Sequence, residues 1–481
     1  MNMFLKYGLV QTAVFALLMG NVLNANGQVN SEKETEHMIG ASRGAASPLV
    51  FSVNNENIAV VDPGVFINTK ETLVRDGLGN FFSKLQQNRP VTIGYIGGSI
   101  TQAFYGYRLQ SAKYIQSLYP DVKMQFLNAG VSGTGTDLGA CRLKDQILTH
   151  HPDLIFIEFA VNGAYQDGME GMIRQIIRDN PKTDICLIYT LISGQAKGYT
   201  EGFVPENIQG LEEIAEYYHI PSIHLGMEAA ALEKAGKLIW KGEPASAADQ
   251  IVFSADGVHP TIEGGNIYAA AIARGINKMK IHSIASNHIL PKPLFPNNWE
   301  DAKMIDPLEV AKFSTGWTKI LTSENAQLKQ FDGWFPYLMY TEKTGSSFTF
   351  KFTGTMVGFY DLGGPEVGEV SIELDGKLVM LQEIYVKGYH YYKVLPAGTN
   401  GASVINRFNS YCNNRYRGQY EFLETGPGQH TVTVVLSSLK ANKAMILGKN
   451  QQEDISINPA KYDRTALYLG KILLKGDLVK E

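Results

Sequence analysis

Three residues on two distant segments could together carry out nucleophilic chemistry on an acyl group. Ser99 follows the apolar run 91–96 and a pair of glycines. A serine hydroxyl is a weak nucleophile near neutral pH, so it needs an imidazole within hydrogen-bond reach and a carboxylate that holds the imidazole in the right tautomer. His259 and Asp256, three residues apart before the last predicted helix, are the candidates for that base and its orienting group.

The same chemistry needs hydrogen-bond donors for the negative oxygen that develops on the attacked carbonyl. One such donor is worth about 2.7–4 kcal/mol of transition-state stabilisation. The candidates are the N–H of Ser99, the N–H of Gly133 in the loop Asn128–Gly133, and the side-chain amide of Asn162 in Phe159–Gly163. The sequence therefore offers a nucleophile, a base, an orienting group and an oxyanion hole.

Each of these residues also has an ordinary structural explanation. Ser99 could cap a strand-to-helix turn, Asn162 could be a turn residue, and Gly133 could be a simple loop glycine. The Asp256 and His259 pair could be a helix N-cap beside a solvated histidine, or half of a metal site. Independent turns would rarely combine all of these residues in this chain order, so the set as a whole favours catalysis.

The elements that must position these residues alternate between about Gly77 and Ile281. Short apolar runs alternate there with amphipathic segments, which predicts a parallel sheet wrapped by helices in a three-layer, flavodoxin-like α/β domain. The candidate residues would then meet at the carboxyl edge of the sheet, where such folds bind ligands. The predicted strands are Thr92–Ile96, Lys123–Leu127, Leu154–Phe159, Ile185–Leu191 and Ser222–Leu225. The predicted helices are Tyr107–Leu118, Leu138–His150, Met169–Asn180, Pro205–Tyr218, Met227–Ala235 and Gly264–Met279.

The sequence changes character beyond Ser283. A proline-rich segment, Pro291–Pro296, leads into runs of alternating apolar and polar residues, separated by glycine-containing turns, which predict an all-β, jelly-roll-like sandwich. Leu49–Phe51 and Ile58–Val61 are also strand-like, and we predict that they join this β domain. The predicted division is 28–76 for the N-terminal segment, 77–283 for the α/β domain and 284–481 for the β domain.

The N-terminal residues 1–27 resemble a secretory signal. Lys6 precedes an apolar stretch that is too short for a membrane span, and Ala25–Gly27 provides a small-x-small cleavage site. We therefore expect a secreted or periplasmic protein with no membrane span after processing. The formal charge of −4 is spread along the chain, which argues against a nucleic-acid partner. The oligomeric state is left open.

The three cysteines are too few and too scattered for a disulfide framework or a metal cluster, and we predict that they are packing residues. They are Cys141, Cys186 and Cys412.

Together, the candidate motifs resemble the conserved blocks of the SGNH (GDSL-like) serine hydrolases. Gly97–Thr101 resembles the first block in a Gly-Gly-Ser-Ile-Thr variant, in which Gly98 stands where aspartate is commoner. The second, third and fifth blocks correspond to Asn128–Gly133, to Asn162, and to Asp256 with His259. The resemblance covers only the α/β part of the chain.

The resemblance implies a role for each residue and requires no metal or cofactor. Ser99 would be the nucleophile, His259 the base and later the acid, and Asp256 its orienter. Gly133 would be the oxyanion glycine. One departure is Gly163, which follows Asn162 where the family often has aspartate.

The expected substrate is an acetylated carbohydrate. Gln102 and Tyr105, in the segment after the nucleophile, suit a sugar better than a long acyl chain, and the exported two-domain plan resembles that of bacterial carbohydrate acetylesterases. In the polar segment 406–417, Arg415 and Tyr416 are further candidate substrate contacts. The alternatives are a lipid or thioester hydrolase on the same scaffold, and a carbohydrate-binding protein with a vestigial hydrolase domain.

Aromatic residues are abundant in the C-terminal part of the chain. They could be sandwich core, or some of them could form a stacking platform for sugar rings. The residues in question are Trp334, Tyr385, Tyr389, His390, Tyr391 and Tyr392.

Overall fold

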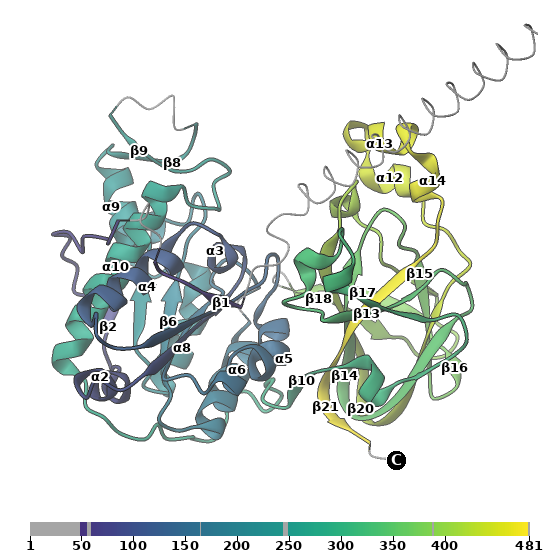
Figure 1. The fold of residues 1–481 in the computed structure, drawn as a ribbon, viewed down its shortest axis with the longest axis horizontal. Coiled ribbons are helices and arrows are strands. Elements are labelled where there is room, and N and C mark those ends of the chain that lie inside the picture. The colour runs from purple at the N-terminus through teal and green to yellow at the C-terminus, as the bar shows by residue number, and fades with distance from the viewer. Residues whose placement is uncertain (1–48, 55–58, 164, 244–248, 387–388, 480–481) are drawn as a thin grey trace, which may run out of the picture.

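A computed structural model describes residues 49–54, 59–163, 165–243, 249–386 and 389–479 (Figure 1). An α/β domain and a β domain lie side by side. The predicted secretory signal, 1–27, lies outside the described residues. Within the described part of the chain, no helix is both long enough and apolar enough to cross a membrane.

The α/β domain is built on a seven-stranded sheet. Its five central strands are parallel and have the chain order 2-1-3-4-5 of flavodoxin-like sheets. All five predicted strands are present. In spatial order the strands are β1 (Val50–Phe51), β4 (Met124–Gly130), β3 (Val91–Gly97), β5 (Leu154–Glu158), β6 (Asp184–Tyr189), β7 (Ser222–His224) and β2 (Thr72–Leu73).

Helices cover both faces of this sheet, and the six predicted helices are all present. The helices of the domain are α2 (Gly79–Gln86), α3 (Ser99–Gln102), α4 (Tyr107–Leu118), α5 (Thr136–Gln146), α6 (Gln166–Asp179), α7 (Lys197–Thr200), α8 (Glu206–Tyr217), α9 (Met227–Lys234) and α10 (Ile262–His282). A parallel pair, β8 (Leu238–Lys241) and β9 (Ile251–Ser254), precedes α10.

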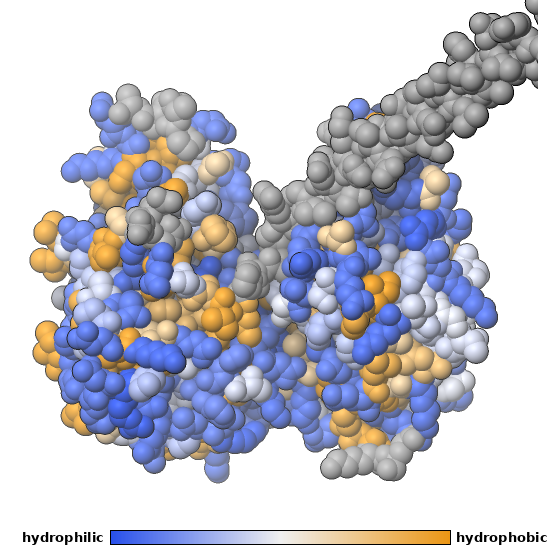
Figure 2. Space-filling view, viewed as in Figure 1, coloured by the Kyte–Doolittle hydropathy of each residue, from blue (hydrophilic) through white to orange (hydrophobic). Residues whose placement is uncertain are grey.

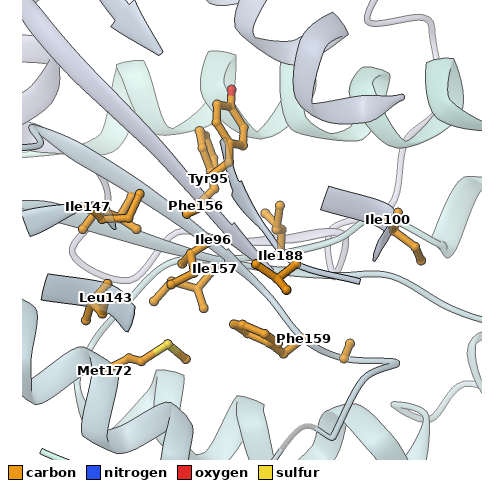
Figure 3. Packing of buried hydrophobic residues seen from close by; sticks show 14 of the residues in the cluster. Tyr95, Ile96, Ile100, Leu143, Ile147, Phe156, Ile157, Phe159, Met172 and Ile188 are labelled. Carbon is orange, nitrogen blue, oxygen red and sulfur yellow. The ribbon is translucent and has the colours of Figure 1, made fainter. Parts of the chain in front are cut away.

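The apolar core lies between the sheet and its helices. Because successive strand residues point to opposite faces, Tyr95 and Ile96 enter different layers of the core. Tyr95 stacks on Phe156 with ring centroids 5.0 Å apart, while Ile96 lies on the side of the sheet that holds Met172 of α6 (Figure 3). Strands buried on both faces explain the near-continuous apolar runs in the sequence.

The prediction that the first strand-like segment joins the β domain is wrong. Val50 and Phe51 pair antiparallel with Leu127 and Phe126, so β1 extends the α/β sheet beyond β4. The Phe51 ring packs 5.6 Å from that of Phe126, which gives this short strand an apolar anchor on the open edge of β4. The second segment forms no strand over residues 59–61, and its Ile58 lies outside the described residues.

The β domain is built mainly from antiparallel strands. Its three long strands are β14 (Ser347–Gly363), β20 (Arg417–Leu436) and β21 (Leu467–Leu478), and β14 pairs with both of the others. The alternating phenylalanines Phe348, Phe350 and Phe352 are buried, as the period-2 pattern predicts. The jelly-roll connectivity stays a prediction.

The remaining elements of the β domain are shorter. The strands are β10 (Ala302–Ile305), β11 (Lys312–Phe313), β12 (Thr318–Leu321), β13 (Tyr337–Thr341), β15 (Glu369–Leu374), β16 (Lys377–Leu378), β17 (Leu381–Val386), β18 (Tyr389–Val394) and β19 (Ile405–Asn406). The helices are α11 (Pro307–Val310), α12 (Lys443–Leu447), α13 (Glu453–Ile457) and α14 (Pro459–Tyr462).

The segment that joins the domains is fixed along α6. The carboxylate of Glu170 accepts the backbone N–H groups of Leu294 and Phe295, at 2.6 and 2.8 Å. Trp299 is buried, and its ring lies 4.9 Å from that of Phe422 in β20. In the space-filling view the domains are two lobes that meet at this junction (Figure 2). The two domains are therefore packed on each other and are not joined by a free linker.

The three cysteines are buried thiols without a disulfide, which confirms their prediction as packing residues.

Candidate active site

Ser99 is the first residue of the short helix α3, directly after β3 and Gly98. At Gly97 a Cβ atom would lie 2.2 Å from the Thr101 hydroxyl and 2.4 Å from the Glu158 carbonyl oxygen. Only glycine therefore fits where the strand turns into the helix. Because the N–H at the start of a helix has no acceptor within the helix, the Ser99 N–H is available to a ligand.

The structure brings Ser99, His259 and Asp256 together in one hydrogen-bonded chain. The Ser99 Oγ lies 2.8 Å from His259 Nε2, and His259 Nδ1 lies 2.6 Å from Asp256 Oδ2. With Nδ1–H donated to the carboxylate, Nε2 is left to accept the serine proton. The side chains of His259 and Asp256 are about half exposed, so the serine–histidine pair is open to a substrate.

Asp256 is held as a carboxylate by its surroundings. Its Oδ1 accepts the N–H groups of Val258 and His259, at 2.8 Å each, and the Ser254 hydroxyl, at 2.9 Å. Burial alone would raise the pKa of Asp256, but the hydrogen bonds from the His259 side chain and from these backbone groups hold it well below its usual range. Asp256 therefore stays charged wherever the imidazole can work as a base.

The loop that carries His259 is anchored on both sides. Thr261 caps α10 by accepting the Gly264 N–H at 3.1 Å, and its own N–H donates to the Phe253 carbonyl at 2.8 Å. Gly257, at φ +90°, accepts the Trp240 indole N–H at 3.2 Å. Because Thr261 is the helix cap, the Asp256 and His259 side chains are not used as one, and this removes one of the structural explanations of the motif.

Asn162 lies directly against the residue that precedes the nucleophile. A Cβ atom at Gly98 would come within 2.5 Å of Asn162 Oδ1, so the carboxamide occupies the space that a side chain at Gly98 would need. Asn162 Oδ1 is buried and, among the described residues, accepts no hydrogen bond. With Asn162 in this position, only glycine fits at position 98.

Gln102, which we predicted to contact substrate, instead supports the loop that carries Gly133. Its side chain is 3% exposed, and its Oε1 accepts the Ser132 N–H at 2.8 Å. Gly133 itself has φ +70°, a left-handed conformation that favours glycine. The prediction for Gln102 is therefore corrected: its side chain positions the loop 128–133, the candidate oxyanion loop.

Two buried arginines hold the backbone around Ser99: Arg142 binds strand ends, and Arg108 binds the helix α3. Arg142 donates to the carbonyls of Gly97, at 3.0 Å, and of Ala129, while Arg108 donates to the Thr101 carbonyl at 2.9 Å. Burial lowers the pKa of each to about 10, which leaves both charged at neutral pH. Neither arginine could be predicted from the sequence, because an arginine that binds backbone carbonyls has no sequence motif.

A buried carboxyl group lies beneath the same turn. Glu158, at the end of β5, accepts the hydroxyls of Thr101 at 2.9 Å and Thr190 at 2.5 Å. Burial raises its pKa. Thr101 thereby links the nucleophile helix to β5.

The other predicted substrate residues lie in different environments. Tyr105 is 56% exposed beside Phe104, and their rings pack edge to face at 5.1 Å, so an aromatic surface follows the nucleophile helix. Arg415 is partly exposed and donates to the Tyr411 carbonyl at 2.6 Å. Tyr416 is 7% exposed and donates to Glu366 at 2.8 Å, so it is a core residue of the β domain, and the prediction that it contacts substrate is wrong.

The β domain reaches the loop that carries Gly133 through Arg417, which no sequence motif marks. The Nη2 of Arg417, the first residue of β20, lies 2.5 Å from the position that a Cβ of Gly133 would take. Tyr420, three residues further along, donates to Asp137 of α5 at 3.1 Å. Residues of both domains therefore lie beside Gly133 of the candidate site.

A cavity of about 900 Å³ lies elsewhere, between β2, α8 and the proline-rich segment. Arg75, Glu212, Tyr217 and Phe295 are among the residues that line it, and none of the candidate catalytic residues does. Over the described residues, no cluster of three or more His, Cys, Asp or Glu side chains could hold a metal ion.

No family model and no curated protein matches the chain. Among solved structures, a two-domain esterase active on acetylated mannans, co-crystallised with mannopentaose, is similar with a TM-score of 0.57 and 19% identity, over 83% of this chain and 94% of that one. A second structure of a two-domain esterase active on acetylated mannans gives 0.58 and 18%, over 84% and 97%. An acetylxylan esterase from Geobacillus stearothermophilus is 21% identical over 39% of this chain and 94% of that one, with a TM-score of 0.31. The first two matches show that this chain has the fold of a two-domain esterase.

Proposed function

We propose that this chain is a serine esterase of the SGNH (GDSL-like) type, with the Gly-Gly-Ser-Ile-Thr form of the first block, which removes O-acetyl groups from a carbohydrate. The observation that carries the proposal is the continuous chain of hydrogen bonds from Ser99 through His259 to Asp256, 2.8 and 2.6 Å long. A histidine that was only solvated, or only packed in the core, would have no need to contact both a carboxylate and a serine at the end of a strand.

The reaction proceeds in two halves. His259 Nε2 takes the proton as Ser99 Oγ attacks the acetyl carbonyl, and the N–H groups of Ser99 and Gly133 with the Asn162 amide hold the negative oxygen. His259 then gives the proton to the departing sugar oxygen, which leaves an acetyl-serine. Water attacks this ester with His259 again as base, and acetate departs as Ser99 regains its proton.

The substrate class rests on two supports. The solved structures with the same two-domain fold are esterases active on acetylated mannans, and the surface after α3 presents the exposed rings of Phe104 and Tyr105, which suit the faces of sugar rings. The β domain is proposed to be a jelly-roll-like sandwich that shapes this site. With the signal-like residues 1–27, we place the enzyme outside the cell or in the periplasm.

Ser99→Ala tests the proposal. The variant should fold normally and lose at least about 10⁴-fold in kcat on p-nitrophenyl acetate and on acetylated mannan and xylan oligosaccharides. A fluorophosphonate probe should label the native chain at Ser99. The matched control, Ser117→Ala, removes a hydroxyl that donates only to its own helix, and should keep full activity and labelling.

Three results would contradict this proposal. Undiminished turnover by Ser99→Ala would exclude the mechanism, and an absence of labelling would favour a vestigial hydrolase domain. Faster cleavage of long-chain than of acetyl nitrophenyl esters would instead favour a lipid or thioester hydrolase.

A further inference from the structure

Two arginines of the β domain lie on one exposed tyrosine beside the oxyanion loop. The Tyr411 ring is 4.2 Å from the Arg417 guanidinium and 5.4 Å from that of Arg415. Tyr411 is 54% exposed, and Arg417 also contacts Gly133 of the α/β domain. We call Tyr411, Arg415 and Arg417 the arginine cluster.

The arginine cluster has no carboxylate partner in the described part of the chain. No Asp or Glu there lies within ion-pair distance of Arg415 or Arg417, and the one hydrogen bond they donate goes from Arg415 to the Tyr411 carbonyl. The nearby Arg407 differs, because it pairs with Asp361 at 2.7 Å and Glu421 at 3.1 Å. The chain thus neutralises one arginine of this segment and leaves the next two unneutralised.

Two partly buried guanidinium groups without a nearby carboxylate destabilise the folded protein. Burial lowers the pKa of Arg417; Tyr411 acts in the opposite direction, and the charge of Arg415 lowers the pKa further. A planar guanidinium matches a carboxylate with two parallel hydrogen bonds, and the ring of Tyr411 restricts its orientation. An anion placed at the cluster would therefore bind against groups that are already oriented.

The oxyanion of the reaction is a poor candidate for that anion. It exists only transiently, and the N–H groups of Ser99 and Gly133 with the Asn162 amide already supply donors for it. The cluster adjoins Gly133 from the side of the β domain, so it can contact a part of the substrate beyond the acetyl ester.

We propose that the arginine cluster binds a carboxylate carried by the sugar chain, so that the preferred substrate is an O-acetylated acidic, uronic-acid-containing carbohydrate. This proposal rests on the proposed function and deepens it. Arg417 supplies the bidentate contact, Arg415 adds to the positive potential, and Tyr411 supports both.

A matched pair of substrates tests the proposal. Acetylated galacturonate oligosaccharides are compared with the same oligosaccharides after methyl esterification, which removes the negative charge and keeps the sugar ring. Acetate release is measured apart from methanol release. The native enzyme should have at least a tenfold higher kcat/KM on the free acid, and this preference should shrink as the salt concentration rises.

The variants separate recognition from catalysis. Arg417→Gln should lose about 10–100-fold in kcat/KM on the free acid, mainly through KM, and less than about threefold on the methyl ester and on p-nitrophenyl acetate. Arg464→Ala is the matched control, since it removes an arginine of the same domain that is paired with Glu342, and it should change none of these values.

Binding gives a readout that does not depend on turnover. In the Ser99→Ala background, calorimetry with galacturonate oligosaccharides should show binding that Arg417→Gln weakens by a similar factor. Equal losses on all substrates would make Arg417 a support of the oxyanion loop and overturn the proposal. A native enzyme without preference for the free acid would also overturn it. Failure of the proposed function would show itself differently, as no turnover of p-nitrophenyl acetate and no labelling of Ser99.

Discussion

Asp137 is a buried carboxyl group at the contact between the two domains, and its protonation can be tested. It is the second residue of α5, its side chain is 1% exposed, and its Oδ1 accepts the Tyr420 hydroxyl of β20 at 3.1 Å. Burial raises its pKa from 3.8 to about 7, although the Leu138 N–H and Tyr420 act in the opposite direction. We therefore expect Asp137→Asn to stabilise the protein at alkaline pH.

The sign and size of the effect follow from linkage. The folded protein keeps a proton on Asp137 up to about pH 7, whereas the unfolded chain releases it near pH 3.8. Between these values the folded state binds more protons, so stability falls by about 1.36 kcal/mol for each unit of rising pH. The total penalty above pH 7 is at most about 4 kcal/mol, and relaxation of the site would reduce it.

Asparagine has nearly the same shape, carries no charge and can still accept the Tyr420 hydroxyl. Urea unfolding at pH 4.5, 6, 7 and 8 should show Asp137→Asn gaining about 1–4 kcal/mol over the native chain at pH 8, with the gain vanishing toward pH 4.5. Asp332→Asn, at an exposed position, is the control and should change little at any pH. A gain that did not depend on pH, or a loss of stability at pH 8, would refute the reasoning.

Two further predictions concern the geometry around the nucleophile. Gly98→Ala should lower kcat at least about tenfold, because its Cβ would displace the Asn162 amide, and the loss should nearly disappear in an Asn162→Ala background, as a double-mutant cycle would measure. Asp256→Asn should lower kcat by about 10⁴-fold at neutral pH, because the His259 tautomer is no longer fixed, and a loss below tenfold would contradict the role given to the 2.6 Å contact.

The sequence was most informative where a single local pattern decided the structure. The strand β5 is buried along its whole length, and such a strand must read as a continuous apolar run. The carboxyl ends of parallel strands share one edge, so the sites of Ser99, Gly133 and Asn162 could be predicted as neighbours from their places after three strands.

Side-chain directions on short elements could not be predicted in the same way. Gln102 lies three residues after Ser99 on a four-residue helix, and no periodicity in so short a segment shows which of its residues faces the loop. The strand β1 has two residues, and its partner is chosen by the open edge of β4 and the contact of Phe51 with Phe126. Both outcomes depend on tertiary packing that local sequence patterns do not encode.

The contact between the domains gives the β domain a part in the site itself. Arg417 lies against Gly133, and Tyr420, on the same strand, donates to Asp137 at the start of the helix that follows the oxyanion loop. Trp299 is fixed on α6, where Gly171 leaves no room for a side chain between them. Arg417 and Tyr420 are close together on β20, and they contact the loop that carries Gly133 and the helix α5, respectively. A shift of the β domain would therefore move Arg417 and this loop together. The two domains are thus better described as one packed unit than as two independent modules.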